Sequence, residues 1–158
     1  MPVTFAATGH RPPKLGGYSP EAAGKLQSIA RAYLSANHPD QIISGMALGW
    51  DTAWALAGLD LGIPLIAAVP FPGQSSRWPT MDFLVYHQIM KRADRVQIIY
   101  QSYNPQAFQA RNQYMVNSCN QLVAMWDGSS GGTANCIQYA KKVKKPWVNL
   151  YNSYKESL

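Results

Sequence analysis

Apolar residues in this chain fall into short continuous runs that are separated by longer segments with a helical repeat. The short runs are rich in Val, Ile, Leu and Ala and are bounded by Gly, Pro or polar residues, which is typical of strands. The run at 65–69 has no polar alternation, as expected of a parallel strand that is covered on both faces. Strands are therefore predicted at residues 3–7, 41–44, 65–69, 96–100, 122–126 and 147–150.

The segments between these runs predict helices. Ser19 and Pro20 provide an N-cap and a first-turn proline, apolar positions in 26–34 recur every three or four residues, and His38-Pro39 ends the pattern. A second helix is predicted at 52–61, and because it has little polarity on any side, we expect it to be well buried. Three further helices are predicted at 81–93, 106–116 and 133–143.

Strand and helix alternate along the whole chain. This order predicts right-handed βαβ units and an α/β fold, a Rossmann-like, doubly wound, mostly parallel sheet of about six strands with helices on both faces. The 158 residues fit one domain, and we expect a single domain over 1–158. In such sheets, ligands bind beyond the carboxyl ends of the strands, where the strand order reverses.

Glycine-bearing segments follow the first, second and fifth predicted strands, at 8–17, 44–52 and 127–133. We expect them to converge on one edge of the sheet. Backbone amides at a helix N-terminus are unpaired donors with a partial positive charge, so such a turn can act as a phosphate-binding loop. Arg11 adds a side chain that can bind phosphate in a bidentate way. The plainer alternatives are a stiff surface loop and, for Asp51, a helix cap.

The sequence lacks two common nucleotide-binding motifs. No lysine follows the glycines of 128–132 as it does in a P-loop, and G-x-G-x-x-G is missing after the first strand, which disfavours P-loop ATPases and NAD-binding Rossmann enzymes. His10, His38 and His87 share no metal-ligand spacing, so we expect no metal ion and no other cofactor.

The composition of the chain indicates which kinds of partner and which compartment to expect. The net charge of +6 favours anionic ligands, although the lysines of 141–145 stand where the last helix should end and cations are favoured there anyway. No apolar run approaches the roughly 20 residues that a membrane span needs. Cys119 and Cys136 are isolated, and residues 1–10 do not have a signal-peptide pattern, so we expect reduced thiols and a cytoplasmic protein.

Polar and aromatic residues outside the three loops add further candidates. Arg111 and Asn112 could present a cation and an amide to a ligand, whereas Tyr114 and Met115 are expected to face the core. Trp50 or Trp78 could flank a base, and Arg77 stands next to Trp78 in a loop. The alternative is that Arg77 and Trp78 only pack at the surface of the protein.

The segments TGHRPPKLGGY, SGMALGWD, RNQYMV and WDGSSGGT, in this order, resemble the SLOG superfamily. This Rossmann-like group includes the SMF/DprA and Lonely-guy proteins, and the chain is most similar to its YpsA-like, TGHRP-bearing branch, which is common in bacteria and phages. The resemblance covers nearly the whole chain. It implies a nucleotide-related site formed by 8–11, 44–51 and 127–133, with Arg111 and Asn112 nearby, and a homo-oligomer.

One motif departs from the Lonely-guy pattern. Those enzymes cleave the N-glycosidic bond of nucleoside monophosphates and carry a glutamate shortly after the glycine turn, whereas here Ala134, Asn135 and Cys136 follow Thr133. An amide cannot replace a carboxylate in this chemistry. If the protein is such an enzyme, Asp51 or Asp127 would therefore have to supply the catalytic carboxylate.

We predict a protein that binds a nucleotide or a nucleotide-derived, phosphorylated, adenosine-like small molecule, as a sensor or a sequestering protein. The alternative is a hydrolase that cleaves an N-glycosidic or phosphoester bond, and single-stranded nucleic acid binding ranks third. No membrane partner is expected. The candidate ligand-binding residues are Thr8, Gly9, His10, Arg11, Lys14, Ser44, Gly45, Met46, Ala47, Gly49, Trp50, Asp51, Arg77, Arg111, Asn112, Asp127, Gly128, Ser129, Ser130, Gly131, Gly132 and Thr133.

Overall fold

A computed structural model describes residues 2–158 of the chain. Within these residues, six strands form one sheet in the order β4-β3-β2-β1-β5-β6, and all neighbouring strands are parallel. The predicted doubly wound α/β fold is thereby confirmed. The strands are β1 (Thr4–Gly9), β2 (Gln41–Ser44), β3 (Leu65–Val69), β4 (Arg95–Ile98), β5 (Gln121–Met125) and β6 (Trp147–Asn149).

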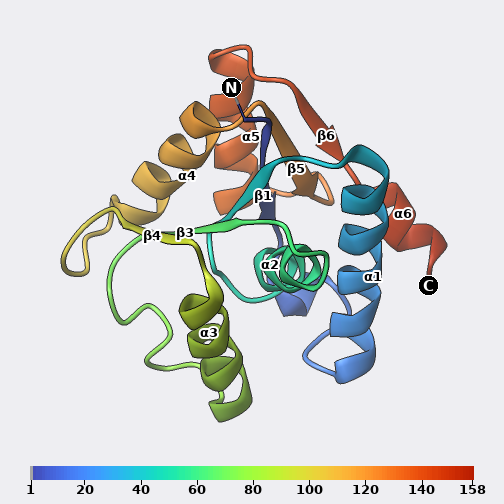
Figure 1. Cartoon of the computed structure of the whole chain (residues 1–158), viewed down its shortest axis with the longest axis horizontal. Coiled ribbons are helices and arrows are strands. Elements are labelled where there is room, and N and C mark those ends of the chain that lie inside the picture. Colours follow the sequence, from blue (N-terminus) through green and yellow to red (C-terminus); the bar gives the residue numbers. More distant parts are fainter. Residues whose placement is uncertain (1) are drawn as a thin grey trace.

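Helices cover both faces of this sheet (Figure 1). One face packs against α1, α2, α3 and α6, and the other packs against α4 and α5. Successive strand side chains point to opposite faces, so β1 sends Phe5 and Ala7 into the first core and Ala6 into the second. The helices are α1 (Pro20–Asn37), α2 (Trp50–Asp60), α3 (Thr80–Arg92), α4 (Ala107–Ser118), α5 (Gly132–Lys142) and α6 (Tyr151–Glu156), and a 3-10 turn, η1, spans Pro12–Lys14.

Two short elements were not expected from the sequence, η1 and α6. Each is too short to show a helical repeat of apolar positions. The α6 segment is held by tertiary packing, because Tyr154 is buried in the core shared with α1 and its ring lies beside Tyr151. The structure also extends β1 to Gly9, so Thr8 and Gly9 belong to the end of a strand.

The order in which successive strands are placed in the sheet reverses between β1 and β5. From β1 the strands proceed outward to β4, and the chain then returns to place β5 on the other side of β1. The ends of the two strands lie side by side, with Thr8 opposite Ala124 and Gly9 opposite Met125. The loops that leave β1 and β5 therefore start next to each other, at the place where such folds bind ligands.

No helix among residues 2–158 combines the length and the apolar character that crossing a bilayer requires.

Candidate ligand-binding pocket

A pocket of about 440 Å³ opens at the carboxyl edge of the sheet. Its wall is formed by the loops after β1, β2 and β5 together with one side of α4. The three glycine-bearing segments thus meet at one edge, as their positions after parallel strands led us to expect. The volume falls within the range of roughly 300–1,000 Å³ that is usual for small-molecule sites.

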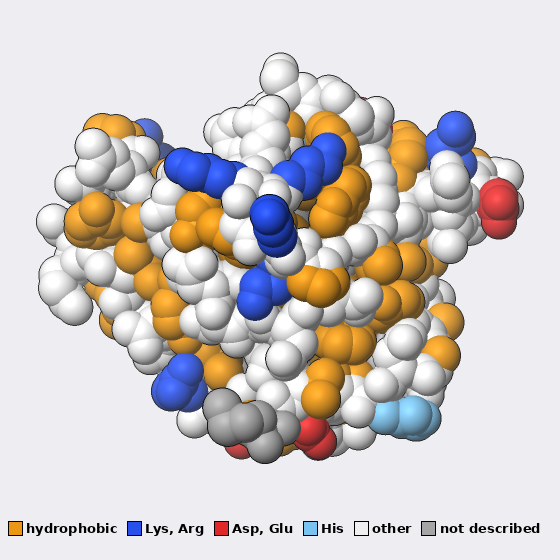
Figure 2. All heavy atoms as spheres, turned by 90° about the horizontal axis from the view of Figure 1, so that it is seen from above, with side chains coloured by type: hydrophobic (Ala, Val, Ile, Leu, Met, Phe, Trp, Pro, Cys, Tyr) orange, Lys and Arg blue, Asp and Glu red, His pale blue; other side chains and the backbone are white. Residues whose placement is uncertain are grey.

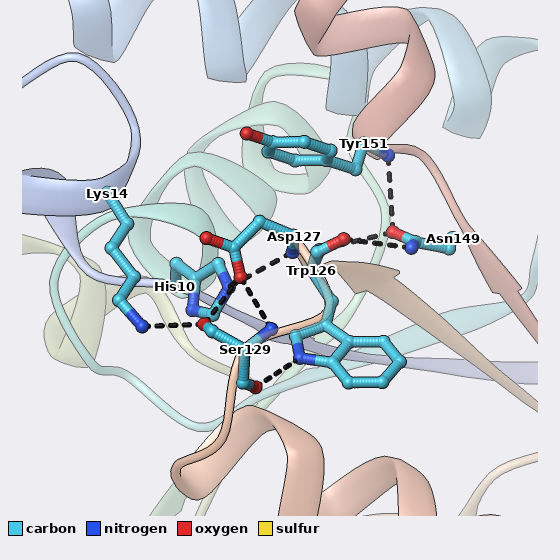
Figure 3. Close-up of polar contacts among 7 residues, drawn as sticks. All are labelled: His10, Lys14, Trp126, Asp127, Ser129, Asn149 and Tyr151. Atoms are coloured by element: carbon cyan, nitrogen blue, oxygen red, sulfur yellow. Dashed lines mark hydrogen bonds and ion pairs between the residues drawn. The ribbon is translucent and has the colours of Figure 1, made fainter.

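Hydrogen bonds tie the β1 loop to the β5 loop beside this pocket (Figure 3). His10 Nε2 lies 2.7 Å from Asp127 Oδ1, and the hydroxyl of Ser129 donates to the same oxygen at 2.5 Å. Lys14 Nζ donates to Ser129 Oγ at 2.6 Å. We call these four residues the loop latch. The latch fixes the position of one pocket wall.

The outer side of the β5 loop is held by a second group of contacts (Figure 3). Trp126 Nε1 donates to the carbonyl of Ser129 at 2.8 Å. The Asn149 side chain accepts from the Trp126 amide at 3.1 Å and donates to the Trp126 carbonyl at 2.9 Å. The same Asn149 oxygen accepts from the amide of Tyr151, so the loop is anchored to β6 and α6.

Asp127 has a structural role in the latch. The hydroxyl and amide of Ser129, with a further contribution from His10, hold the pKa of Asp127 well below its usual range. Asp127 is not among the residues that line the pocket. The turn role that the sequence offered as an alternative for this aspartate accounts for its contacts with Ser129, and the contact with His10 joins the two loops.

The N-terminus of α5 opens onto the pocket. Residues 130–133 line it, and the N-cap is Gly131, whose φ of 139° lies in the region that favours glycine. Gly131 supplies no side-chain cap, so the amides of the first turn face the cavity without a competing side chain at this position. Asn112 donates to the Gly132 carbonyl at 3.3 Å and thereby connects α4 to this turn.

Arg111 reaches from α4 to the loop after β2. Its guanidinium donates to the carbonyl of Gly45 at 2.9 Å and lies 5.7 Å from the centre of the Phe108 ring. The side chain is only 7% exposed, and Nε has no hydrogen-bond partner among the described residues. Burial lowers the pKa of Arg111, whereas the nearby Asp51 carboxyl acts in the opposite direction.

Asp51 lies at the start of α2 and also lines the pocket. One carboxylate oxygen accepts from the Ala47 amide at 3.3 Å, and the other accepts no hydrogen bond within residues 2–158. With 4% exposure, burial raises the pKa of Asp51 to about 6, although the Arg111 cation partly opposes this shift. Asp51 is therefore a carboxyl group that titrates close to neutral pH.

The Asp51 carboxyl and the Arg111 side chain both approach Gly45 closely. A Cβ atom on Gly45 would lie 2.8 Å from Asp51 Oδ2 and 3.0 Å from Arg111 Nε. Only glycine fits at this position without displacing one of the two charged groups. This close approach is a packing role, which differs from the ligand contact that the sequence suggested for Gly45.

Part of the turn between β2 and α2 is covered by the β1 loop, although Ala47 in this turn and Asp51 at the start of α2 line the pocket. The Trp50 amide, at the start of α2, donates to the His10 carbonyl at 3.2 Å, so the β1 loop covers this helix N-terminus. Trp50 is fully buried and its Nε1 donates to the Val123 carbonyl at 3.3 Å. We expected Trp50 to stand beside a base, but it lies in the core beneath Gly9 and does not reach the pocket.

The loop before α3 does not line the pocket either. Trp78 packs edge-to-face on Tyr86, with the ring centres 5.3 Å apart, and Arg77 is absent from the pocket wall. Conversely, Phe108 lines the pocket although no sequence pattern indicated it, and Met115, which we expected only in the core, lines the pocket as well. Phe108 precedes Arg111 by three residues on α4, and this spacing places both side chains on one helix face.

The candidate residues therefore divide into two groups. Those that line the pocket are Thr8, Gly9, His10, Arg11, Lys14, Ala47, Asp51, Arg111, Asn112, Ser130, Gly131, Gly132 and Thr133. Those outside its wall are Ser44, Gly45, Met46, Gly49, Trp50, Arg77, Asp127, Gly128 and Ser129. That the first group binds a ligand stays a prediction.

In the part of the chain that the structure describes, no group of three or more His, Cys, Asp or Glu side chains is placed to hold a metal ion.

Comparison with known sequences identifies relatives. A family model described as the YspA SLOG family matches residues 5–153. YoqJ, an uncharacterized SPbeta prophage-derived protein of Bacillus subtilis, is 30% identical over 135 residues, which cover 75% of this chain and 79% of YoqJ.

Comparison with solved structures identifies the same architecture. DNA processing protein A (DprA) from Streptococcus pneumoniae matches with a TM-score of 0.70 and 21% identity over 93% of this chain. The molybdenum cofactor carrier protein of Chlamydomonas reinhardtii matches with a TM-score of 0.60 and 18% identity, over 94% of this chain and 76% of its own. The chain spans only 50% of the length of that DprA. At these identities the likeness concerns the fold alone.

Proposed function

The chain belongs to the YspA SLOG family, and we propose that it binds a nucleotide or another phosphorylated, adenosine-like small molecule in the pocket at the carboxyl edge of the sheet. In this proposal the protein acts as a sensor or a sequestering protein. The molybdenum cofactor carrier protein with the same fold favours small-molecule binding by this architecture.

The observation that carries the proposal is the N-terminus of α5 in the pocket wall. Its first turn, with Gly131 as N-cap, offers backbone amides and the positive end of the helix dipole to an anion. Arg11 and Lys14 line the same pocket and supply two further cations. A phosphate group fits this set of donors, because guanidinium, ammonium and amide groups all donate to phosphate oxygens.

A thermal-shift screen tests the proposal. Nucleoside monophosphates, cyclic nucleotides and ADP-ribose are each added at about a hundredfold excess over Kd, where binding to the folded state stabilises it by about 2.7 kcal/mol. We expect a rise in Tm with at least one of these ligands. The rise is expected to shrink in Arg11→Gln and to persist in the control Arg31→Gln, whose side chain is exposed on α1 outside the pocket. No shift with any of these compounds contradicts the proposal.

The raised pKa of Asp51 favours a second candidate function, hydrolysis of a nucleotide. A carboxyl group with a pKa of about 6 is present as acid and as base near neutral pH, which suits general acid-base catalysis. Cleavage of an N-glycosidic or phosphoester bond would then depend on this residue. The test is product formation from nucleoside monophosphates, measured by chromatography. Activity that is lost in Asp51→Asn and retained in Asp60→Asn supports hydrolysis by Asp51. Unchanged activity in Asp51→Asn contradicts the role of Asp51, and the absence of product with the wild type contradicts hydrolysis.

The third hypothesis, nucleic acid binding, would use another part of the molecule. The lysines of 141–145 lie at the C-terminal end of α5, whereas the pocket lies at its N-terminal end. Figure 2 shows Lys and Arg side chains gathered on the face seen from above Figure 1, with Asp and Glu side chains only toward its periphery. Single-stranded DNA binding through the lysines of 141–145 would weaken steeply with salt and would be reduced in Lys141→Gln. Arg11→Gln would leave it unchanged.

A further inference from the structure

Three aromatic rings form a continuous row that begins in the wall of the pocket. Phe108 lines the pocket, and its ring meets Phe71 edge-to-face with the centres 5.6 Å apart. Phe71 in turn meets Tyr103 edge-to-face at 5.4 Å. Tyr103 is 66% exposed although it is large and partly apolar. We call these three residues the aromatic row.

The order of the strands separates this row from the anion-binding end of the pocket. Phe71 follows β3, and Tyr103 follows β4, and both strands lie on the β2 side of β1. The α5 N-terminus follows β5, on the other side of β1. A ligand that spans the pocket would therefore meet amides and cations at one end and an aromatic surface toward the other.

Two buried charged residues, Arg111 and Asp51, also line the pocket. Arg111 lies next to Phe108 on α4, and its guanidinium is 5.7 Å from the ring centre. Arg111 Nε and one Asp51 carboxylate oxygen have no hydrogen-bond partner within residues 2–158, but both atoms are themselves buried, so a ligand would meet the other polar atoms of these two side chains. Polar groups of this kind suit the sugar of a nucleoside, whose hydroxyls both donate and accept hydrogen bonds.

We propose that Phe108, the end of the aromatic row that lines the pocket, is the subsite for the base of the ligand, so that the pocket takes a nucleoside phosphate in preference to a sugar phosphate or a free phosphate. This inference rests on the proposed function and adds the orientation of the ligand. The phosphate lies at the start of α5, the sugar lies near Asp51 and Arg111, and the base packs against Phe108.

The chemistry of the row also predicts how selective the subsite is. An aromatic surface binds any base through its π-face, and selectivity among bases by hydrogen bonding requires polar side chains that Phe108 and Phe71 lack. We expect purine nucleotides to bind more tightly than pyrimidine nucleotides because they present more area. The difference between the bases is expected to be smaller than the difference between a nucleotide and ribose 5-phosphate.

Isothermal titration calorimetry tests the subsite. The titrants are the four common nucleoside monophosphates, ribose 5-phosphate and inorganic phosphate, with the wild-type protein, Phe108→Leu and Phe108→Tyr. For the wild type we expect at least one nucleotide to bind about 10- to 100-fold more tightly than ribose 5-phosphate, as base stacking on an aromatic side chain implies. Phe108→Leu should reduce that ratio about tenfold by weakening the nucleotide alone, and Phe108→Tyr should retain it.

Phe83→Leu is the matched control. Phe83 is a partly exposed phenylalanine on α3 that does not line the pocket, and its ring packs on His87. This variant should bind every titrant as the wild type does. If Phe108→Leu does not fold, Phe108→Met provides the test, because it keeps a large apolar side chain without the ring, and it should lower nucleotide affinity several-fold without affecting ribose 5-phosphate.

The outcomes separate the subsite from the proposed function. If nucleotides and ribose 5-phosphate bind with equal affinity, or if Phe108→Leu weakens both equally, the base subsite is wrong and phosphate binding stands. If none of the titrants binds and the thermal-shift screen is also negative, the proposed function fails and the subsite fails with it.

Discussion

The ammonium group of Lys14 donates a 2.6 Å hydrogen bond to the hydroxyl of Ser129, a residue that is 115 positions away in the sequence. The same hydroxyl donates to Asp127, which is also bonded to His10. Neither loop contains a long apolar segment of its own that could fix its conformation. The shape of the pocket wall therefore depends on polar contacts between the β1 and β5 loops.

Removal of the Ser129 hydroxyl should loosen this wall. In Ser129→Ala, Asp127 loses a hydrogen bond to its carboxylate and Lys14 loses its acceptor. We expect the free energy of unfolding to fall by about 1–2 kcal/mol, as measured by urea denaturation, and nucleotide affinity to fall as well. Ser35→Ala, at an exposed position of α1, is the control and should change neither quantity. Equal effects of the two substitutions would show that the latch does not hold the wall.

Asp51 should make the stability of the protein depend on pH between about 4 and 6. Its folded pKa of about 6 lies above the ordinary value of 3.8, so the folded state binds this proton more tightly than the unfolded state. The associated stability is fully present below pH 4 and is lost as the pH rises through 6, by an amount of order 3 kcal/mol.

The Asp51→Asn variant should therefore be more stable than the wild type at neutral pH by about 1–3 kcal/mol and nearly equal to it at pH 4. Urea denaturation across this pH range measures the difference. Asp60→Asn, which changes a half-exposed carboxylate at the end of α2, is the control and should follow the wild-type curve. A constant difference between Asp51→Asn and wild type at all pH values would show that Asp51 does not titrate in this window.

A methyl group at Gly45 should disrupt the centre of the pocket. In Gly45→Ala the added Cβ would lie 2.8 Å from Asp51 Oδ2 and 3.0 Å from Arg111 Nε, and both side chains are buried. We expect a loss of about 1–3 kcal/mol in the free energy of unfolding, typical of overpacking. Gly24→Ala is the control and should raise the free energy of unfolding slightly, because Gly24 lies on α1 with open space around it and alanine is the better helix former. A Gly45→Ala protein as stable as the wild type would contradict the described packing.

The layout of the sheet could be predicted because its determinants are local. Continuous apolar runs such as 65–69, bounded by proline or glycine, are sufficient to indicate buried parallel strands, and the placement of their loops at one edge follows from the fold class. For the same reason the stretches around Arg11 and Gly131 could be assigned to the pocket wall before any contact was known.

The identity of the aromatic pocket residue could not be predicted because it depends on distant contacts. Trp50 follows a glycine turn and resembled a ligand-facing residue, but its ring lies under Gly9, in a space that only a glycine on β1 leaves open. Phe108 occupies the wall because the chain after β4 returns to place α4 over the opposite face of the sheet. The sequence around Trp50 and around Phe108 determines neither of these positions.

The most direct test of the central claim is a nitrogen-15 NMR titration of the wild-type protein with a nucleoside monophosphate. We predict that the largest amide shifts occur at the start of α5, at Gly131, Gly132 and Thr133, and in the β1 loop around Arg11. Shifts confined to the lysine-bearing end of α5 at 141–145, or no shifts at any ligand concentration, would contradict the claim that the phosphate binds at the N-terminus of this helix.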